Sequence, residues 1–210
     1  DDVIALVVQP GVEFGDDHVV DYDSSKAQHL LDVLKHRPQL IFEAHSTDYQ
    51  RPSAYRELVR DGFSILKVGP ALTYAMRQAL FAFARMEAEC IPAAQQSHLM
   101  QVAEDAMLKQ PANWQSHYHG SAEHQRLLRS YSYSDRIRYY WLIPEVKRAV
   151  DVLMANLGQR PLDEMLVSEF LPQQYEKARA GLLELRAVPL LLDKVQDALA
   201  PYRAACATGA

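Results

Sequence analysis

Hydrophobic positions in the first third of the chain are gathered in three short runs. Residues 3–8 (VIALVV) are continuously apolar and rich in β-branched side chains. Residues 40–42 repeat the pattern in shorter form, and residues 63–69 repeat it with polar interruptions. Runs of this kind are typical of strands in a parallel sheet that helices cover on both faces. We therefore predict three strands and expect the first of them to be buried on both sides.

Each of these runs is followed by a segment with the spacing of an amphipathic helix. The first helix is expected over residues 24–37, with Ser24 or Ser25 as its N-cap. A second follows Pro52, which suits a first helical turn, and a third follows Pro70. Strand and helix thus alternate three times, which is the pattern of parallel β-α-β units.

After about residue 92 no further strand is predicted. Helices are expected over five segments that prolines separate: 96–110, 122–130, 144–157, 161–170 and 187–205. We therefore divide the chain into a β/α part, residues 1–92, and a helical extension packed on it, residues 93–210. A closed (β/α)₈ barrel needs eight units, and an open three-stranded sheet leaves two edges unpaired. The predicted fold class is thus α/β, with three strands that belong to a longer barrel or need a partner to complete one.

Bulk composition excludes several classes of function. The 210 residues include 22 basic and 27 acidic ones, a net charge of −5, whereas nucleic-acid binders carry a basic stripe. The apolar runs are far shorter than the roughly 18 residues of a membrane span, and the acidic start does not resemble a signal peptide. Cys90 and Cys206 are far apart and lack metal-ligand spacing. We expect a cytoplasmic protein without nucleic-acid or membrane partners.

Polar residues at the ends of the three strands are the first candidates for function. The carboxyl ends of parallel strands share one edge of a sheet, so segments 9–13, 43–48 and 69–70 should face the same side. The candidate catalytic residues in these segments are Glu13, Glu43, His45 and Asp48. Carboxylate and imidazole groups can move protons, and His45 is also a candidate metal ligand.

Structural alternatives for these four residues stay open. His45 can order the strand ends by hydrogen bonding with Glu43 and Asp48. Asp48 can cap the helix that starts near Pro52 or brace the loop, and Glu13 can face solvent.

The turn after the third strand is a candidate phosphate site. Gly69 permits close approach of the backbone, and free amides at the start of the following helix can receive an anion. The predicted phosphate-binding residues are Gly69, Ala71, Leu72 and Thr73. The alternative is a tight strand-to-helix turn in which Pro70 starts the helix.

A cluster of arginines and aromatic residues is a third candidate site, an interface with another protein. Such residues are enriched at protein interfaces, and the predicted interface consists of Arg136, Arg138, Tyr139, Tyr140 and Trp141. Alternatively, the aromatic side chains pack the helical extension onto the barrel while Asp135 pairs with Arg136 or Arg138.

Four stretches in order resemble a known family. They are VVQPGVEF (7–14), EAHSTDYQ (43–50), LKVGPALT (66–73) and SDRIRYYW (134–141). Together they resemble the GatZ/KbaZ family, the Z subunits of class II tagatose-1,6-bisphosphate aldolase, whose members are considerably longer. The resemblance implies strands six, seven and eight of a TIM barrel followed by a C-terminal helical extension.

The resemblance also implies a function. The Z subunit is non-catalytic and supports the activity and stability of a catalytic Y subunit, in the manner of a chaperone. Its pathway is the breakdown of galactitol or N-acetylgalactosamine through D-tagatose 6-phosphate. Zinc belongs to the Y subunit, so no cofactor is expected in this chain. The expected partners are the Y subunit and, alternatively, further copies of the chain in a homo-oligomer.

The metal ligands of catalytic relatives bear on whether this chain is itself catalytic. In those relatives, histidines project from barrel strands that include the sixth and seventh. His45 lies at the end of the seventh-like strand, but the sixth-like strand ends in Gln9, whose neutral amide is a poor zinc ligand. This departure favours a non-catalytic subunit. The alternative is a free-standing sugar-phosphate enzyme that uses residues 43–48, either a zinc-dependent lyase or a tagatose-6-phosphate kinase, although the sequence contains no G-x-x-x-x-G-K-[ST] loop.

Overall fold

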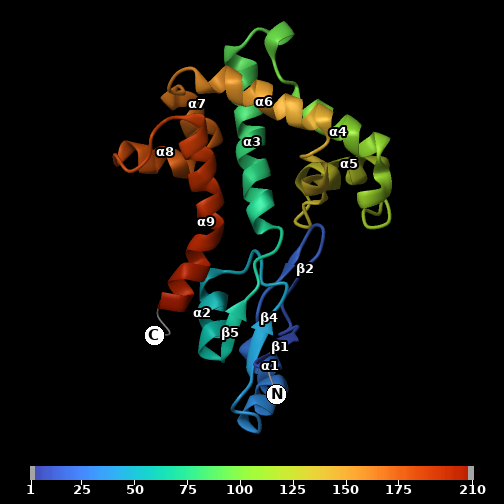
Figure 1. Ribbon diagram of the computed structural model, residues 1–210, viewed down its shortest axis with the longest axis vertical. Helices are drawn as coiled ribbons and strands as arrows, with labels where there is room; N and C mark the ends of the chain where they lie inside the picture. Colours follow the sequence, from blue (N-terminus) through green and yellow to red (C-terminus); the bar gives the residue numbers. More distant parts are fainter. Residues whose placement is uncertain (1–2, 208–210) are drawn as a thin grey trace. The chain divides into compact units, whose positions relative to one another are not determined.

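A computed structural model describes residues 3–207, in which the chain forms two compact units (Figure 1). The strand unit runs to Leu72 and resumes at Ala198, and the helical unit comprises Thr73–Asp197. This division differs from the predicted one after residue 92, because most of α3 (Ala71–Cys90) packs with the helices that follow it. Residues 1–2 and 208–210, the ends of the two predicted parts, lie outside the described residues.

The strand unit is built on a parallel sheet. Its three strands lie in the order β1 (Ala5–Val8), β4 (Ile41–Ala44) and β5 (Phe63–Leu66). The register places Val7, Glu43 and Ile65 in one row across the sheet. The three predicted strands and their parallel direction are therefore confirmed.

Two helices connect the strands and cover one face of the sheet. They are α1 (Ser24–Lys35) and α2 (Pro52–Arg60), and their apolar sides pack on Phe42, Ala44 and Phe63. The predicted N-cap of α1 is wrong by one residue, since Asp23 accepts a hydrogen bond from the backbone N–H of Ser25 at 3.0 Å. Aspartate is among the preferred N-cap residues because its carboxylate satisfies a free amide of the first turn.

The opposite face of the sheet is open within the described part of this unit. Val7 is 60% exposed and Ile65 is 39% exposed. The prediction that the first strand is buried on both faces is therefore wrong for this chain, because a single layer of helices covers the sheet. Parallel sheets ordinarily bury both faces, so the exposed Val7 and Ile65, on either side of Glu43, are the unusual feature of the unit.

A short hairpin follows the first strand and was not predicted. It pairs β2 (Glu13–Phe14) with β3 (Val19–Val20) in antiparallel fashion. The backbone N–H of Gly15 closes the turn by donating to the carbonyl of His18 at 2.9 Å. Strands of two residues are too short to show a repeating hydrophobic pattern, which is why the sequence predicts a loop here.

The helical unit is arranged around α3 (Figure 1). The helices that follow are α4 (Leu99–Lys109), α5 (Ala122–Tyr131), α6 (Pro144–Gly158), α7 (Glu164–Phe170), α8 (Pro172–Arg179) and α9 (Ala187–Ala207). Their core includes Phe83, Met86 and Leu153, all fully buried. The five predicted helices are present with shifted ends. The sequence does not predict α8, in which Pro172 occupies the first turn instead of ending a helix.

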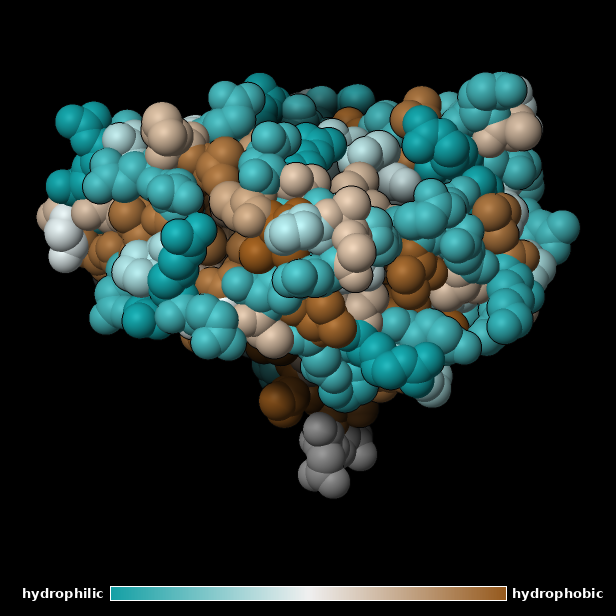
Figure 2. Space-filling view, turned by 90° about the horizontal axis from the view of Figure 1, so that it is seen from above, coloured by the Kyte–Doolittle hydropathy of each residue, from teal (hydrophilic) through white to brown (hydrophobic). Residues whose placement is uncertain are grey.

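Hydrophobic residues are interspersed among polar ones on the face of the molecule that Figure 2 shows. In the helical unit, Leu142, Met165 and Leu182 are among the most exposed, at 87%, 80% and 78%. Over residues 3–207, no helix combines the length and the hydrophobicity needed to cross a membrane.

Candidate functional site

The carboxyl ends of the parallel strands meet at a small cavity. Its volume is about 190 Å³ and its lining consists of Phe14, His45, Ser46, Asp48, Lys67, Gly69 and Pro70. Beyond β1, the side-chain amide of Gln9 donates to the hydroxyl of Ser46 at 3.2 Å. The hydroxyl of Thr47 donates to the backbone carbonyl of Lys67 at 2.8 Å. These bonds join the three polar segments on one side of the sheet, as predicted.

Glu43 and His45 form a pair at the end of β4. Nε2 of His45 lies 2.7 Å from Oε1 of Glu43, and both side chains are about three-quarters buried. They meet because positions two apart on a strand point to the same side of the sheet. A carboxylate bonded to an imidazole fixes the orientation of the ring and can hold or pass a proton. The pair therefore has the chemistry of a general base.

The carboxylate of Asp48 binds backbone amides at the start of α3. This carboxylate is buried, with the residue 1% exposed, and accepts hydrogen bonds from the backbone N–H groups of Gly69 at 2.9 Å and Ala71 at 3.2 Å. These amides precede and open α3, where the helix dipole favours a negative charge. Asp48 therefore caps α3. The alternative that it caps the helix near Pro52 does not hold, because α2 has no side-chain cap hydrogen bond.

This cap bears directly on the predicted phosphate site. Two of the four residues predicted to bind phosphate, Gly69 and Ala71, already donate their amides to Asp48. A Cβ atom at Gly69 would lie 2.7 Å from Oδ2 of Asp48, so glycine is required for this close approach. An external anion at these amides would have to displace the carboxylate. The contributions of Leu72 and Thr73 to phosphate binding stay predictions.

The loop that presents Asp48 has an unusual backbone. Ser46 and Tyr49 both adopt positive φ angles, 57° and 64°, which are uncommon outside glycine. The two residues between them, Thr47 and Asp48, are turned inward and are at most 1% exposed. The ring of Tyr49 packs edge-on against Phe14 of the hairpin at 5.5 Å between centroids. The positive φ angles of Ser46 and Tyr49 have an energetic cost, and they keep the side chains of Thr47 and Asp48 buried.

A pair of buried tyrosines lies behind this loop and was not predicted. The rings of Tyr55 on α2 and Tyr202 on α9 lie 4.2 Å apart, and the hydroxyl of Tyr202 is 3.2 Å from Oγ1 of Thr47. Burial raises the pKa of Tyr202 to about 12, and the charge of Asp48 adds to the shift. Burial also raises the pKa of Tyr55 well above its ordinary value, and Tyr202 reinforces this. The sequence gives no local signal for a contact between residues so far apart in the chain.

The remaining predicted site residues do not join this cluster. Glu13 is exposed on β2 and does not line the cavity. Across the described residues, 3–207, no three side chains from His, Cys, Asp and Glu lie close enough to share a metal ion. Glu43 and His45 alone do not make a zinc site, which ordinarily has at least three protein ligands.

The predicted interface residues have mixed surroundings in the helical unit. Tyr140 is buried in the 3₁₀ helix η3 (Arg136–Tyr140), and its hydroxyl donates to the carbonyl of Gln110 at 2.5 Å. Tyr139 is 48% exposed, and the guanidinium of Arg138 lies over its ring. Part of the cluster is therefore core, while Tyr139 is exposed and Arg138 is half-buried, with its guanidinium donating to the carbonyls of Ser134 and Asp135.

Asp135 does not pair with the neighbouring arginines of this cluster. Oδ1 of Asp135 accepts from Nε of Arg77 on α3 at 2.7 Å, and both side chains are at least 97% buried. The predicted pairing of Asp135 with Arg136 or Arg138 side chains is therefore wrong. A buried carboxylate needs a close cation, and α3 supplies one across the core.

Comparison with known proteins matches the chain to a family and to a solved structure. The sequence model of a family described as D-tagatose-1,6-bisphosphate aldolase subunit GatZ/KbaZ-like matches residues 1–207. The chain is also similar to the crystal structure of a probable tagatose 6 phosphate kinase from Sinorhizobium meliloti 1021, with 50% sequence identity and a TM-score of 0.94. That match covers 97% of this chain and 53% of the solved one, so the chain spans about half the length of its structural relative.

Proposed function

Because this chain belongs to the GatZ/KbaZ-like family of D-tagatose-1,6-bisphosphate aldolase subunits, we propose that it acts within an accessory, non-catalytic subunit of that aldolase. In this role it supports the activity and stability of a catalytic Y subunit, which holds the zinc. The pathway is carbohydrate breakdown through D-tagatose 6-phosphate, from galactitol or N-acetylgalactosamine, in the cytoplasm.

One observation carries the non-catalytic part of this proposal. The polar groups at the strand ends bind one another: Asp48 holds the amides of Gly69 and Ala71, and Thr47 holds the carbonyl of Lys67. Such contacts fix the shape of the strand ends and occupy groups that a substrate phosphate would use. An accessory subunit needs a stable surface more than it needs free catalytic groups.

We propose further that the three strands are the sixth, seventh and eighth of a TIM barrel, with α3 as its last helix and the extension beginning after residue 92. The sheet supports this in two ways. Parallel strands that are adjacent in the sheet also follow one another along the chain, as in a barrel. Within this sheet β1 and β5 are the edge strands, and each pairs with β4. In addition, Val7 and Ile65, which flank Glu43 across the sheet, are exposed apolar side chains that a barrel interior would bury.

The test uses the full-length protein and its Y subunit. We expect the isolated protein to leave tagatose 1,6-bisphosphate uncleaved with zinc present, and to raise both the aldolase activity and the thermal midpoint of the Y subunit when mixed with it. A Y subunit whose activity and midpoint stay the same in the mixture would contradict the proposal.

A second function is favoured by the pair of Glu43 and His45. A hydrogen-bonded carboxylate and imidazole beside a cavity that Lys67 also lines could act as a base in a free-standing sugar-phosphate enzyme. The name of the structural relative, a probable tagatose 6 phosphate kinase, points to the same substrate class. Turnover by the isolated protein that disappears in His45→Ala would establish this alternative and overturn the accessory role.

A further inference from the structure

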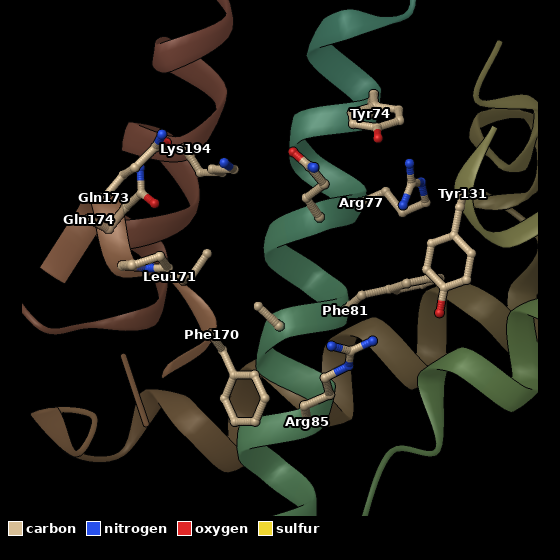
Figure 3. A pocket seen from close by; sticks show the side chains of 13 residues that line it. Tyr74, Arg77, Phe81, Arg85, Tyr131, Phe170, Leu171, Gln173, Gln174 and Lys194 are labelled. Atoms are coloured by element: carbon tan, nitrogen blue, oxygen red, sulfur yellow. The ribbon is translucent and has the colours of Figure 1, made fainter. Parts of the chain in front are cut away.

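A cavity in the helical unit lies along one side of α3. It has a volume of about 410 Å³, within the range of small-molecule sites. Six of its lining residues come from α3 at helical spacing: Tyr74, Arg77, Gln78, Phe81, Ala82 and Arg85. The other walls come from Tyr131 on α5, the segment from Phe170 to Gln174, and Lys194 on α9 (Figure 3). None of the site residues predicted from the sequence lies here.

The lining of this cavity is positively charged. It contains three cations, Arg77, Arg85 and Lys194, and no carboxylate, although the chain as a whole is acidic. Within residues 3–207, neither Arg85 nor Lys194 has an ion-pair partner within 4.0 Å. Two uncompensated cations at one concave surface favour an anion there.

Arg77 adds a buried donor to this lining. Its side chain is 3% exposed and pairs through Nε with Asp135, while its Nη2 is buried without a hydrogen-bond partner. The guanidinium lies over the ring of Tyr74 at 4.3 Å. A buried nitrogen that makes no hydrogen bond is costly, so a ligand oxygen or a water that reaches it would be stabilising.

The start of α8 contributes to the same cavity. Pro172, Gln173 and Gln174 line it, and they form the first turn of that helix. Pro172 has no N–H, but the backbone N–H groups of Gln173 and Gln174 have no acceptor within the helix and carry the positive end of the helix dipole. Together with the cations and the buried Arg77, they make a surface suited to a phosphate group.

We propose that this cavity binds a small organic phosphate. The cations and the α8 amides would hold the phosphate, and the aromatic rings of Tyr74, Phe81 and Phe170 would contact the organic part. The exposed amide of Gln173 can bond to hydroxyl groups on such a ligand. This inference is independent of the proposed function, because its residues all belong to the helical unit and not to the strand ends.

The experiment titrates the full chain by calorimetry with glucose 6-phosphate and with adenosine 5′-monophosphate, using glucose, adenosine and inorganic phosphate as matched probes. We expect at least one ester to bind, and to bind at least tenfold more tightly than either of its two parts. In the Arg85→Gln/Lys194→Gln variant the affinity should fall at least tenfold, since two charge-assisted contacts are lost.

Two control variants make the outcome specific. Arg126→Gln and Arg148→Gln remove exposed arginines of α5 and α6 that lie outside the cavity. Both should bind the ester as the unaltered chain does, and thermal unfolding checks that all variants fold. Absence of binding to both esters, equal binding by the cavity variant, or equal affinity for inorganic phosphate would each overturn the proposal.

Discussion

Asp48 shows at the scale of a residue how one carboxylate can stabilise a candidate site. It is buried and satisfies two amides at the start of α3. Replacing it with alanine leaves those amides without their acceptor, so Asp48→Ala should lower the free energy of unfolding by about 2 kcal/mol. Urea unfolding followed by circular dichroism measures this. Glu13→Ala, at an exposed position, is the control and should change stability by less than about 0.5 kcal/mol. Equal midpoints for the two variants would contradict the capping role.

The buried tyrosines predict a dependence of stability on alkaline pH. Burial raises the pKa of Tyr202 to about 12, from an ordinary value near 10. Between these values the unfolded chain loses the phenolic proton while the folded chain keeps it, so stability is full below pH 10 and falls as the pH rises towards 12. Thermal midpoints measured from pH 8 to pH 11.5 should fall less steeply for Tyr202→Phe than for the unaltered chain. Identical slopes would show that Tyr202 does not titrate differently in the folded state.

Residue-scale contacts of this kind could be predicted only in part. The sequence brings Glu43 and His45 together because they are two positions apart on a strand, and the structure confirms their proximity. It cannot predict that Asp48 binds the amide of Gly69, because that bond depends on how two loops of neighbouring strands meet. The contact of Thr47 with Tyr202 spans 155 residues and depends on where the last helix ends.

At the scale of elements, length and periodicity decide what could be predicted. The long helices α3, α6 and α9 each span at least 15 residues, so their hydrophobic pattern repeats several times and their existence was predicted. The two-residue strands β2 and β3 are too short for a pattern, whereas α8 is not predicted because it begins at a proline, a residue that ordinarily ends helices. Helix ends were predicted least well, because they depend on caps such as Asp23 rather than on periodicity.

Glu87 joins three elements of the helical unit. Its carboxylate, on α3, accepts from the backbone N–H and hydroxyl of Ser97 just before α4, and from the amide of Asn156 on α6 at 2.6 Å. Since the residue is 2% exposed, Glu87→Ala removes acceptors from buried donors and should cost about 3 kcal/mol of stability. Chemical denaturation checks this, with the exposed neighbour Glu89→Ala as the matched control. A loss no larger than that of the control would show that the network does not stabilise the unit.

At the scale of the whole molecule, the sequence predicts the class of the fold better than its organisation. Alternating strands and helices predict a parallel sheet because no other packing joins such units with short turns. The sequence does not predict that the units divide after Leu72 and Asp197, since α3 and α9 each continue through a boundary between units as one helix. Hydrophobic pattern alone does not show with which neighbours a long helix packs.

The open face of the sheet gives a prediction for the complete protein. Val7 is 60% exposed in this chain, and edge strands tolerate lysine, so Val7→Lys should cost the 210-residue chain less than about 1 kcal/mol. If the three strands close a TIM barrel in the full-length protein, the same lysine enters a packed interior and should cost about 3 kcal/mol or more. Denaturant unfolding of both polypeptides measures the difference, and Leu142→Lys, 87% exposed in the helical unit, controls for added charge. An equally small cost in both would show that Val7 stays uncovered, and the barrel proposal would then fail.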